Sequence, residues 1–155
     1  MNADPRVIFK LKLKEKCAEL IEKRMQSAQT AINDAQEAAN SEGKSSAGDK
    51  YETSRAMNHL EKDMHARQQA ENKRELAALH AIDVNTIYSS GNAGAFLKCS
   101  QFSFFIAAGL GKHELDVGTV FFLSPKAPLA KLLHQKTVGD VFVFNNTELK
   151  VVEIF

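Results

Sequence analysis

The hydrophobic and polar positions of this chain follow a helical period in its first half and a strand-like period in its second half. From about Arg6 to Ala39, apolar side chains recur every three or four residues, which is typical of a helix packed along one face. This stripe consists of Leu13, Cys17, Leu20, Ile21, Met25, Ala28, Ile32 and Ala35. From about Lys50 to Ile82, a weaker stripe consists of Met57, Leu60, Met64, Ala70, Ala77, Leu79 and Ile82. The pattern predicts two long helices of matched length.

A short segment of turn-forming residues separates these two helices. Gly43 and Gly48 are the first two glycines of the chain, and both lie in this segment. Since the segment lies near the midpoint of residues 6–82, we expect one intramolecular antiparallel hairpin with its turn between Asn40 and Gly48. Dimerisation of two chains through the same stripes is the alternative.

The first helix begins with lysines at every second position, and a spacing of two does not place them on one helical face. They are Lys10, Lys12, Lys14 and Lys16. We expect a solvated helix start in which these lysines form ion pairs with Glu15 and Glu19.

After Asn85 the pattern changes to short alternating runs separated by turns. The runs at 85–88, 95–98, 101–107, 119–123, 141–144 and 149–155 predict strands. Ser124 and Pro125 predict the start of a short helix that ends at Leu133, because serine favours the cap and proline the first helical position. Asn145-Asn146-Thr147 predicts the turn of a closing hairpin. Every phenylalanine except Phe9 lies after residue 95, so we expect the core here.

The resulting fold class is α+β: a helical hairpin at residues 1–83, and a small, largely antiparallel sheet with one short helix at residues 84–155.

The formal net charge of +1 argues against a polyanion binder that acts by bulk electrostatics. Two cysteines, Cys17 and Cys99, make no disulfide framework. The longest apolar run, Phe104 to Leu110, is too short to span a bilayer, and the N-terminus lacks the features of a signal peptide. We therefore expect a cytoplasmic protein with no membrane association.

The sequence offers no sign of a self-contained active site. Its five histidines have no metal-ligand spacing, and no serine or cysteine has the context of a nucleophile. We expect no intrinsic cofactor and no enzymatic activity of the chain on its own.

Two segments together resemble the bacterial Gre transcript cleavage factors. The first is Gly48-Asp49-Lys50-Tyr51-Glu52, in which the acidic residues are three positions apart. The second runs from Ser124-Pro125 through Val138-Gly139-Asp140 into the terminal hairpin. The resemblance covers nearly the whole chain. It implies an N-terminal antiparallel coiled-coil hairpin and a C-terminal domain of FKBP-like fold.

The resemblance also implies a function in transcription elongation. A factor of this family binds RNA polymerase and inserts its hairpin into the secondary channel, so that the polymerase cuts backtracked RNA. Asp49 and Glu52 would then share a Mg²⁺ ion with the polymerase active site, near the RNA 3′ end. Ser124, Pro125 and Tyr51 would contact the polymerase. Any contact with DNA would occur only through that complex.

Other interpretations of the same residues stay open. Asp49 and Glu52 have the spacing of a capping box, in which they bond the backbone at a helix start. After Glu52 the family usually has Asn-Ala-Glu-Tyr, whereas this chain has Thr53-Ser54-Arg55-Ala56. A regulator that occupies the channel without stimulating cleavage is therefore one alternative. A protein-interaction adaptor built from a coiled coil and an FKBP-like domain is another.

Overall fold

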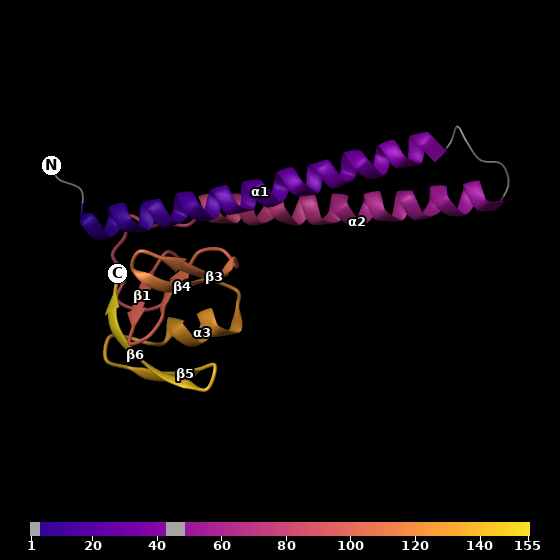
Figure 1. Ribbon diagram of the computed structural model, residues 1–155. Coiled ribbons are helices and arrows are strands. Elements are labelled where there is room, and N and C mark those ends of the chain that lie inside the picture. Colours follow the sequence, from indigo (N-terminus) through magenta and orange to yellow (C-terminus); the bar gives the residue numbers. More distant parts are fainter. Residues whose placement is uncertain (1–3, 43–48) are drawn as a thin grey trace. The chain divides into compact units, whose positions relative to one another are not determined.

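The computed structural model describes residues 4–42 and 49–155 (Figure 1). The elements are α1 (Pro5–Glu42), α2 (Asp49–His80), β1 (Phe96–Cys99), β2 (Ser103–Ile106), β3 (Gly111–Leu115), β4 (Gly118–Leu123), α3 (Pro128–His134), β5 (Val141–Phe144) and β6 (Thr147–Ile154). Contacts group the chain into a sheet unit, Met1–Ala18 with Ala78–Phe155, and a hairpin unit, Glu19–Ala77. Both long helices pass from one unit into the other, and the domain division after residue 83 stays a prediction.

In the hairpin unit, α1 and α2 lie side by side and antiparallel, which confirms the predicted pair of helices (Figure 1). Of the turn predicted between Asn40 and Gly48, residues 40–42 belong to α1, and residues 43–48 lie outside the described part of the chain. The stripe of α1 is confirmed, because Ile21, Ala28 and Ala35 are buried. The helices therefore pack along the α1 face that the sequence predicts.

The stripe predicted for the middle of α2 is wrong. Met57, Leu60 and Met64 are 64%, 69% and 58% exposed. The buried positions of α2 in this unit are instead Gln69 and Asn72. The apolar and the polar residues of α2 both recur at helical spacing, so the spacing does not decide which face packs on α1. The face with Gln69 and Asn72 can be buried because their side-chain amides find hydrogen-bond partners.

The sheet of the sheet unit has six strands in the order β3-β4-β2-β1-β6-β5. β2 and β4 run parallel, and the other neighbouring strands run antiparallel, so the sheet is mixed rather than wholly antiparallel. The α+β class is confirmed. β3 was not predicted, since its residues alternate as Gly-Lys-His-Glu-Leu without an apolar run.

Residues 85–88 were predicted as a strand and form none. The carboxylate of Asp83 accepts hydrogen bonds from the backbone N–H of Asn85, at 2.8 Å, and from the hydroxyl of Thr86. The hydroxyl of Tyr88 donates to the carbonyl oxygen of Asp83 at 2.9 Å. These local bonds compete with a sheet ladder, which is the usual effect of an aspartate that folds back on the following residues.

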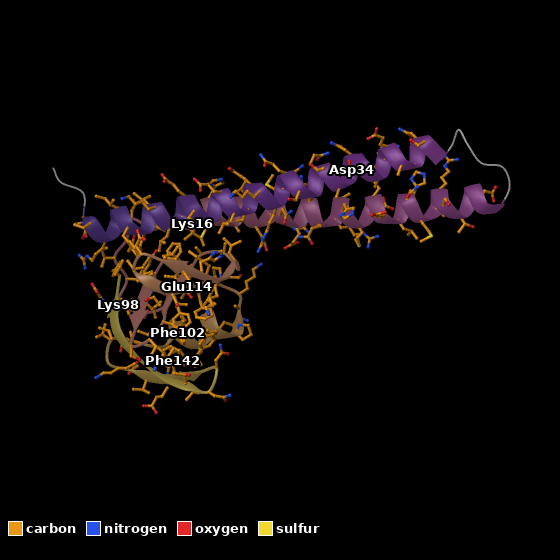
Figure 2. All side chains as sticks on the ribbon, viewed as in Figure 1. Lys16, Asp34, Lys98, Phe102, Glu114 and Phe142 are labelled. Atoms are coloured by element: carbon orange, nitrogen blue, oxygen red, sulfur yellow. The ribbon has the colours of Figure 1, made fainter. Side chains whose placement is uncertain are left out.

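Phenylalanine rings of the sheet unit form two groups of three or more, and Phe105 and Phe122 form a separate pair with ring centroids 6.1 Å apart. The larger group contains Phe102, Phe104, Phe121, Phe142 and Phe144, of which Figure 2 labels Phe102 and Phe142. It packs with buried Leu133 of α3, so the helix covers this core. In the smaller group, the ring centroid of Phe9 lies 4.9 Å from that of Phe96 and 6.0 Å from that of Phe155. Phe9 thereby attaches the start of α1 to the sheet.

The short helix begins later than predicted, at Pro128 rather than at Ser124 and Pro125. Ala127 has an extended backbone, with ψ of 146°, because the residue before a proline is disfavoured in the helical region. A helix started at Pro125 would have to pass through Ala127, and the second proline prevents this. The hairpin turn forms at Asn145 and Asn146 as predicted, with φ of 50° and 61°, the left-handed pair that closes β5 and β6. Thr147 was also assigned to the turn but is the first residue of β6.

Candidate functional site

The acidic pair singled out by the sequence lies at the start of α2. Asp49 is the first residue of this helix, and Glu52 is exposed in its first turn. Residues three apart on a helix lie on neighbouring positions of its surface, so the backbone brings the two residues together. The side chains of Asp49 and Tyr51 are outside the described part of the structure. The described geometry of this pair is therefore a helix start with one exposed carboxylate.

Ser124 and Pro125 lie in the loop between β4 and α3. Pro125 is exposed, and Ser124 is half-buried. The hydroxyl oxygen of Ser124 accepts a hydrogen bond from the backbone N–H of Lys126 at 3.2 Å, and its carbonyl oxygen accepts one from Ala127 at 3.0 Å. These bonds fix the loop and leave Pro125 and Lys126 exposed.

Sequence reasoning missed a lysine that is buried in the sheet unit. Lys10 is fully buried, and its Nζ donates hydrogen bonds to the carbonyl oxygens of Thr86, at 2.7 Å, and Gly94, at 3.1 Å. The same Nζ lies 4.9 Å from the ring centroid of Tyr88, within the range of a cation–π contact. Burial lowers the pKa of Lys10 to about 8.

Lys14, one turn further along α1, also binds backbone carbonyls. Its Nζ donates to the carbonyl oxygens of His80, at 3.2 Å, and Ile82, at 2.8 Å. A cation at the C-terminal end of α2 is favourable, because the last carbonyls of a helix lack partners within it. The prediction of a solvated lysine row is therefore wrong for Lys10 and Lys14.

One sequence signal could have identified Lys10. It precedes Leu13 by three positions and Cys17 by seven, so it continues the apolar stripe of α1 toward the N-terminus. A lysine on such a face needs acceptors for its ammonium protons, and carbonyls of the segment before β1 supply them.

In the hairpin unit, polar side chains of α2 lie between the two helices, and we call this set, Lys62, Gln69 and Asn72, the polar seam. The side-chain amide of Gln69 donates to the carbonyl oxygen of Met25 at 2.9 Å, and Lys62 donates to the side-chain oxygen of Gln36. Asn72 is 1% exposed and bonds to neighbouring glutamines of its own helix. Polar groups at seam positions fix which faces of two helices meet, at a cost in stability.

The surface grooves are open to solvent and are lined by both polar and apolar side chains. One of about 530 Å³ lies in the hairpin unit, between residues that include Arg24, Ala28 and His65. Another of about 450 Å³ lies in the sheet unit, between Phe9 and Leu13 on α1 and the turn that joins β3 to β4. Across residues 4–42 and 49–155, no group of three or more His, Cys, Asp and Glu could hold a metal ion. In the same residues, no helix has the length and apolar character needed to cross a membrane.

Comparison of the chain with protein-family models, curated proteins and solved structures gives no match.

Proposed function

We propose that this chain is a transcription elongation factor that binds RNA polymerase and stimulates cleavage of backtracked RNA. The observation that carries the proposal is a pair of long antiparallel helices with Asp49 and Glu52 at the start of α2. α2 has 32 residues, which at 1.5 Å per residue makes it about 48 Å long. Two packed helices are also thin, about 20 Å across. Such a hairpin suits insertion into the secondary channel better than it suits an enzyme pocket of its own.

The chemistry belongs to the polymerase, and the chain supplies groups to it. Mg²⁺ is commonly bound through one or two carboxylates together with phosphate oxygens, so Asp49 and Glu52 are suitable ligands for an ion shared with the polymerase. Such an ion supplies electrostatic stabilisation of the attacking and leaving oxygens during RNA cleavage. The exposure of Glu52 supports this role, because a carboxylate must be accessible to reach the RNA 3′ end.

The loop at Ser124 and Pro125 is the proposed contact between the sheet unit and the polymerase. Its bonds through Ser124 hold the loop in one conformation, and Pro125 restricts it further. A preorganised loop loses little conformational entropy on binding. Tyr51 would add a contact near the tip. This function requires a cytoplasmic location, and DNA would be met only within the polymerase complex.

The test is an RNA cleavage assay on backtracked polymerase complexes, with binding measured in parallel. Asp49→Asn and Glu52→Gln should abolish stimulated cleavage while binding is retained. Asp63→Asn is the matched control, because Asp63 is an exposed carboxylate of the same helix. This variant should cleave like the wild type.

Three other outcomes distinguish the alternatives. Polymerase binding without stimulated cleavage at any Mg²⁺ concentration would make the chain a channel regulator. Absence of polymerase binding would contradict the proposal and favour an adaptor. Loss of thermal stability in Asp49→Ala with unchanged cleavage would assign the pair to helix capping, because replacement of a capping aspartate by alanine costs about 0.5–2 kcal/mol.

A further inference from the structure

β5 is one of the two edge strands of the sheet, and it differs in chemistry from the other edge, β3. β3 carries Lys112 and Glu114, both exposed. Charged side chains on an edge strand are a common protection against pairing with another chain. β5 reads Val-Phe-Val-Phe and has no charge, no proline and no glycine. Its edge therefore lacks the side-chain protection that the opposite edge has.

The pairing of β5 with β6 determines which backbone groups of β5 point toward the open edge of the sheet. The carbonyl oxygen of Asp140, just before the strand, accepts a hydrogen bond from the N–H of Val151 at 2.9 Å. In an antiparallel pair, alternate residues direct their N–H and C=O groups to the same neighbour, so Phe142 and Phe144 face β6 as Asp140 does. The backbone groups of Val141 and Val143 therefore point toward the open edge of the sheet.

The side chains of the same two valines are exposed as well. Val141 is 45% exposed and Val143 is 65% exposed, whereas Phe142 between them is buried in the core. The strand thus has two apolar side chains on its outer face and two sets of backbone donors and acceptors at its edge. A partner strand would pair with the backbone groups and cover the valines at the same time.

We propose that β5 pairs antiparallel with β5 of a second copy of this chain, centred on Phe142. In this register Val141 lies opposite Val143 of the second copy, and Val143 lies opposite Val141. The outward backbone groups of both strands then form hydrogen-bonded pairs on either side of the two-fold axis. The valines of both copies meet on one face and the sheet continues through the interface.

A second copy fits this edge because the strand is complementary to itself. Valines meet valines, and aliphatic β-branched cross-strand pairs suit a pleated surface. On β6, Lys150 is paired with Val141 and Glu148 with Val143. Each cross-strand row of the joined sheet would therefore begin with a lysine of one copy and end with a glutamate of the other. No like charges face each other across the pairing.

The interface is small, so the dimer should be weak. β5 has four residues, and pairing of two such strands buries much less than the ~1,200 Å² at which stable interfaces begin. The dimer should form at high protein concentration and dissociate on dilution. This inference concerns the edge of the sheet and is independent of the proposed role of the hairpin.

Amide hydrogen exchange and sedimentation equilibrium of the full chain, each over a range of concentrations, test the proposal. The amides of Val141 and Val143 should exchange more slowly as concentration rises, while those of Phe142 and Phe144 should stay unchanged. Val143→Lys should shift the dissociation constant at least tenfold toward monomer. Val152→Lys is the matched control, because Val152 is 52% exposed on β6, away from the edge. This variant should dimerise like the wild type.

Three results would overturn the proposal. The first is a chain that stays monomeric at millimolar concentration. The second is a dimer that survives Val143→Lys in a variant whose melting temperature shows it is folded. The third is protection of the Val141 and Val143 amides only after a different protein, such as RNA polymerase, is added.

Discussion

The Nζ atom of Lys10 lies 4.9 Å from the ring centroid of Tyr88, on a segment that follows α2 in the chain. Together with the hydrogen bonds to Thr86 and Gly94, this contact ties the first turns of α1 to the segment that leads into β1. The sheet unit is therefore built from both ends of the chain. Its α1 segment contributes a buried cation as well as the ring of Phe9.

Replacement of Lys10 should change how stability depends on pH. Burial lowers the pKa of Lys10 from 10.5 to about 8, although Asp83 and Asp4 oppose the shift and Arg6 adds to it. Between these pH values the folded chain binds fewer protons than the unfolded chain, so this group makes the free energy of unfolding rise with pH. Lys10→Met should lack this rise. Chemical denaturation of both proteins from pH 7 to pH 10.5 measures it.

Comparison of the two proteins is essential because the buried thiols act in the opposite direction. Burial raises the pKa of Cys17 to about 12 and that of Cys99 to about 11, so both lower stability as pH rises above about 9. Both cysteines are present in the wild type and in Lys10→Met, and their contributions cancel in the difference. Parallel pH profiles would show that Lys10 does not titrate as inferred.

Gly94→Ala should destabilise the sheet unit strongly. Gly94 has φ of 94°, and a Cβ atom there would lie 2.1 Å from the carbonyl oxygen of Asp83. We expect a loss of more than about 2 kcal/mol in the free energy of unfolding, since strain and a backbone clash combine. Gly111→Ala is the control, because Gly111 has φ of 78° but nothing within 4 Å of its added Cβ. Equal losses in both variants would exclude the clash as the cause.

The polar seam of the hairpin unit predicts unequal effects of two apolar truncations. Met64→Ala should change the free energy of unfolding by less than about 0.5 kcal/mol, because Met64 is 58% exposed. Ile21→Ala should cost about 2–5 kcal/mol, because Ile21 is fully buried. Thermal and urea denaturation measure both. A cost for Met64→Ala as large as for Ile21→Ala would mean that the apolar stripe of α2 is the seam in solution.

Under the proposed function, a change at Pro125 should weaken polymerase binding. Pro125→Ala removes an exposed ring and loosens the loop, so affinity in a competition assay should fall about tenfold, while the melting temperature changes little. Lys136→Ala serves as a comparison, because Lys136 follows the C-terminal end of α3 whereas Pro125 precedes its start, and this variant should bind normally. Undiminished affinity of Pro125→Ala would remove this loop from the proposed interface.

Local sequence patterns were sufficient to predict an element where the preference of neighbouring residues alone determines the backbone conformation. Helical spacing from Leu13 to Ala35 predicted α1, and Asn145-Asn146 predicted the turn between β5 and β6. The start of α3 was misplaced at Ser124 although its signal was local, since Ala127-Pro128 overrides Ser124-Pro125. The spacing of Asp49 and Glu52 also predicted the start of a helix, and α2 begins at Asp49.

The sequence by itself determined the two long helices, the aromatic core and the closing hairpin, because each depends on periodicity or on turn residues within a few positions. Only the tertiary structure decided the rest. Whether Met64 or Gln69 faces α1 depends on which amides find acceptors across the seam. Whether Lys10 is solvated or buried depends on carbonyls more than 70 positions away. Such contacts form only when distant segments meet, so the acceptors that satisfy Gln69 and Lys10 cannot be read from the residues next to them in the chain.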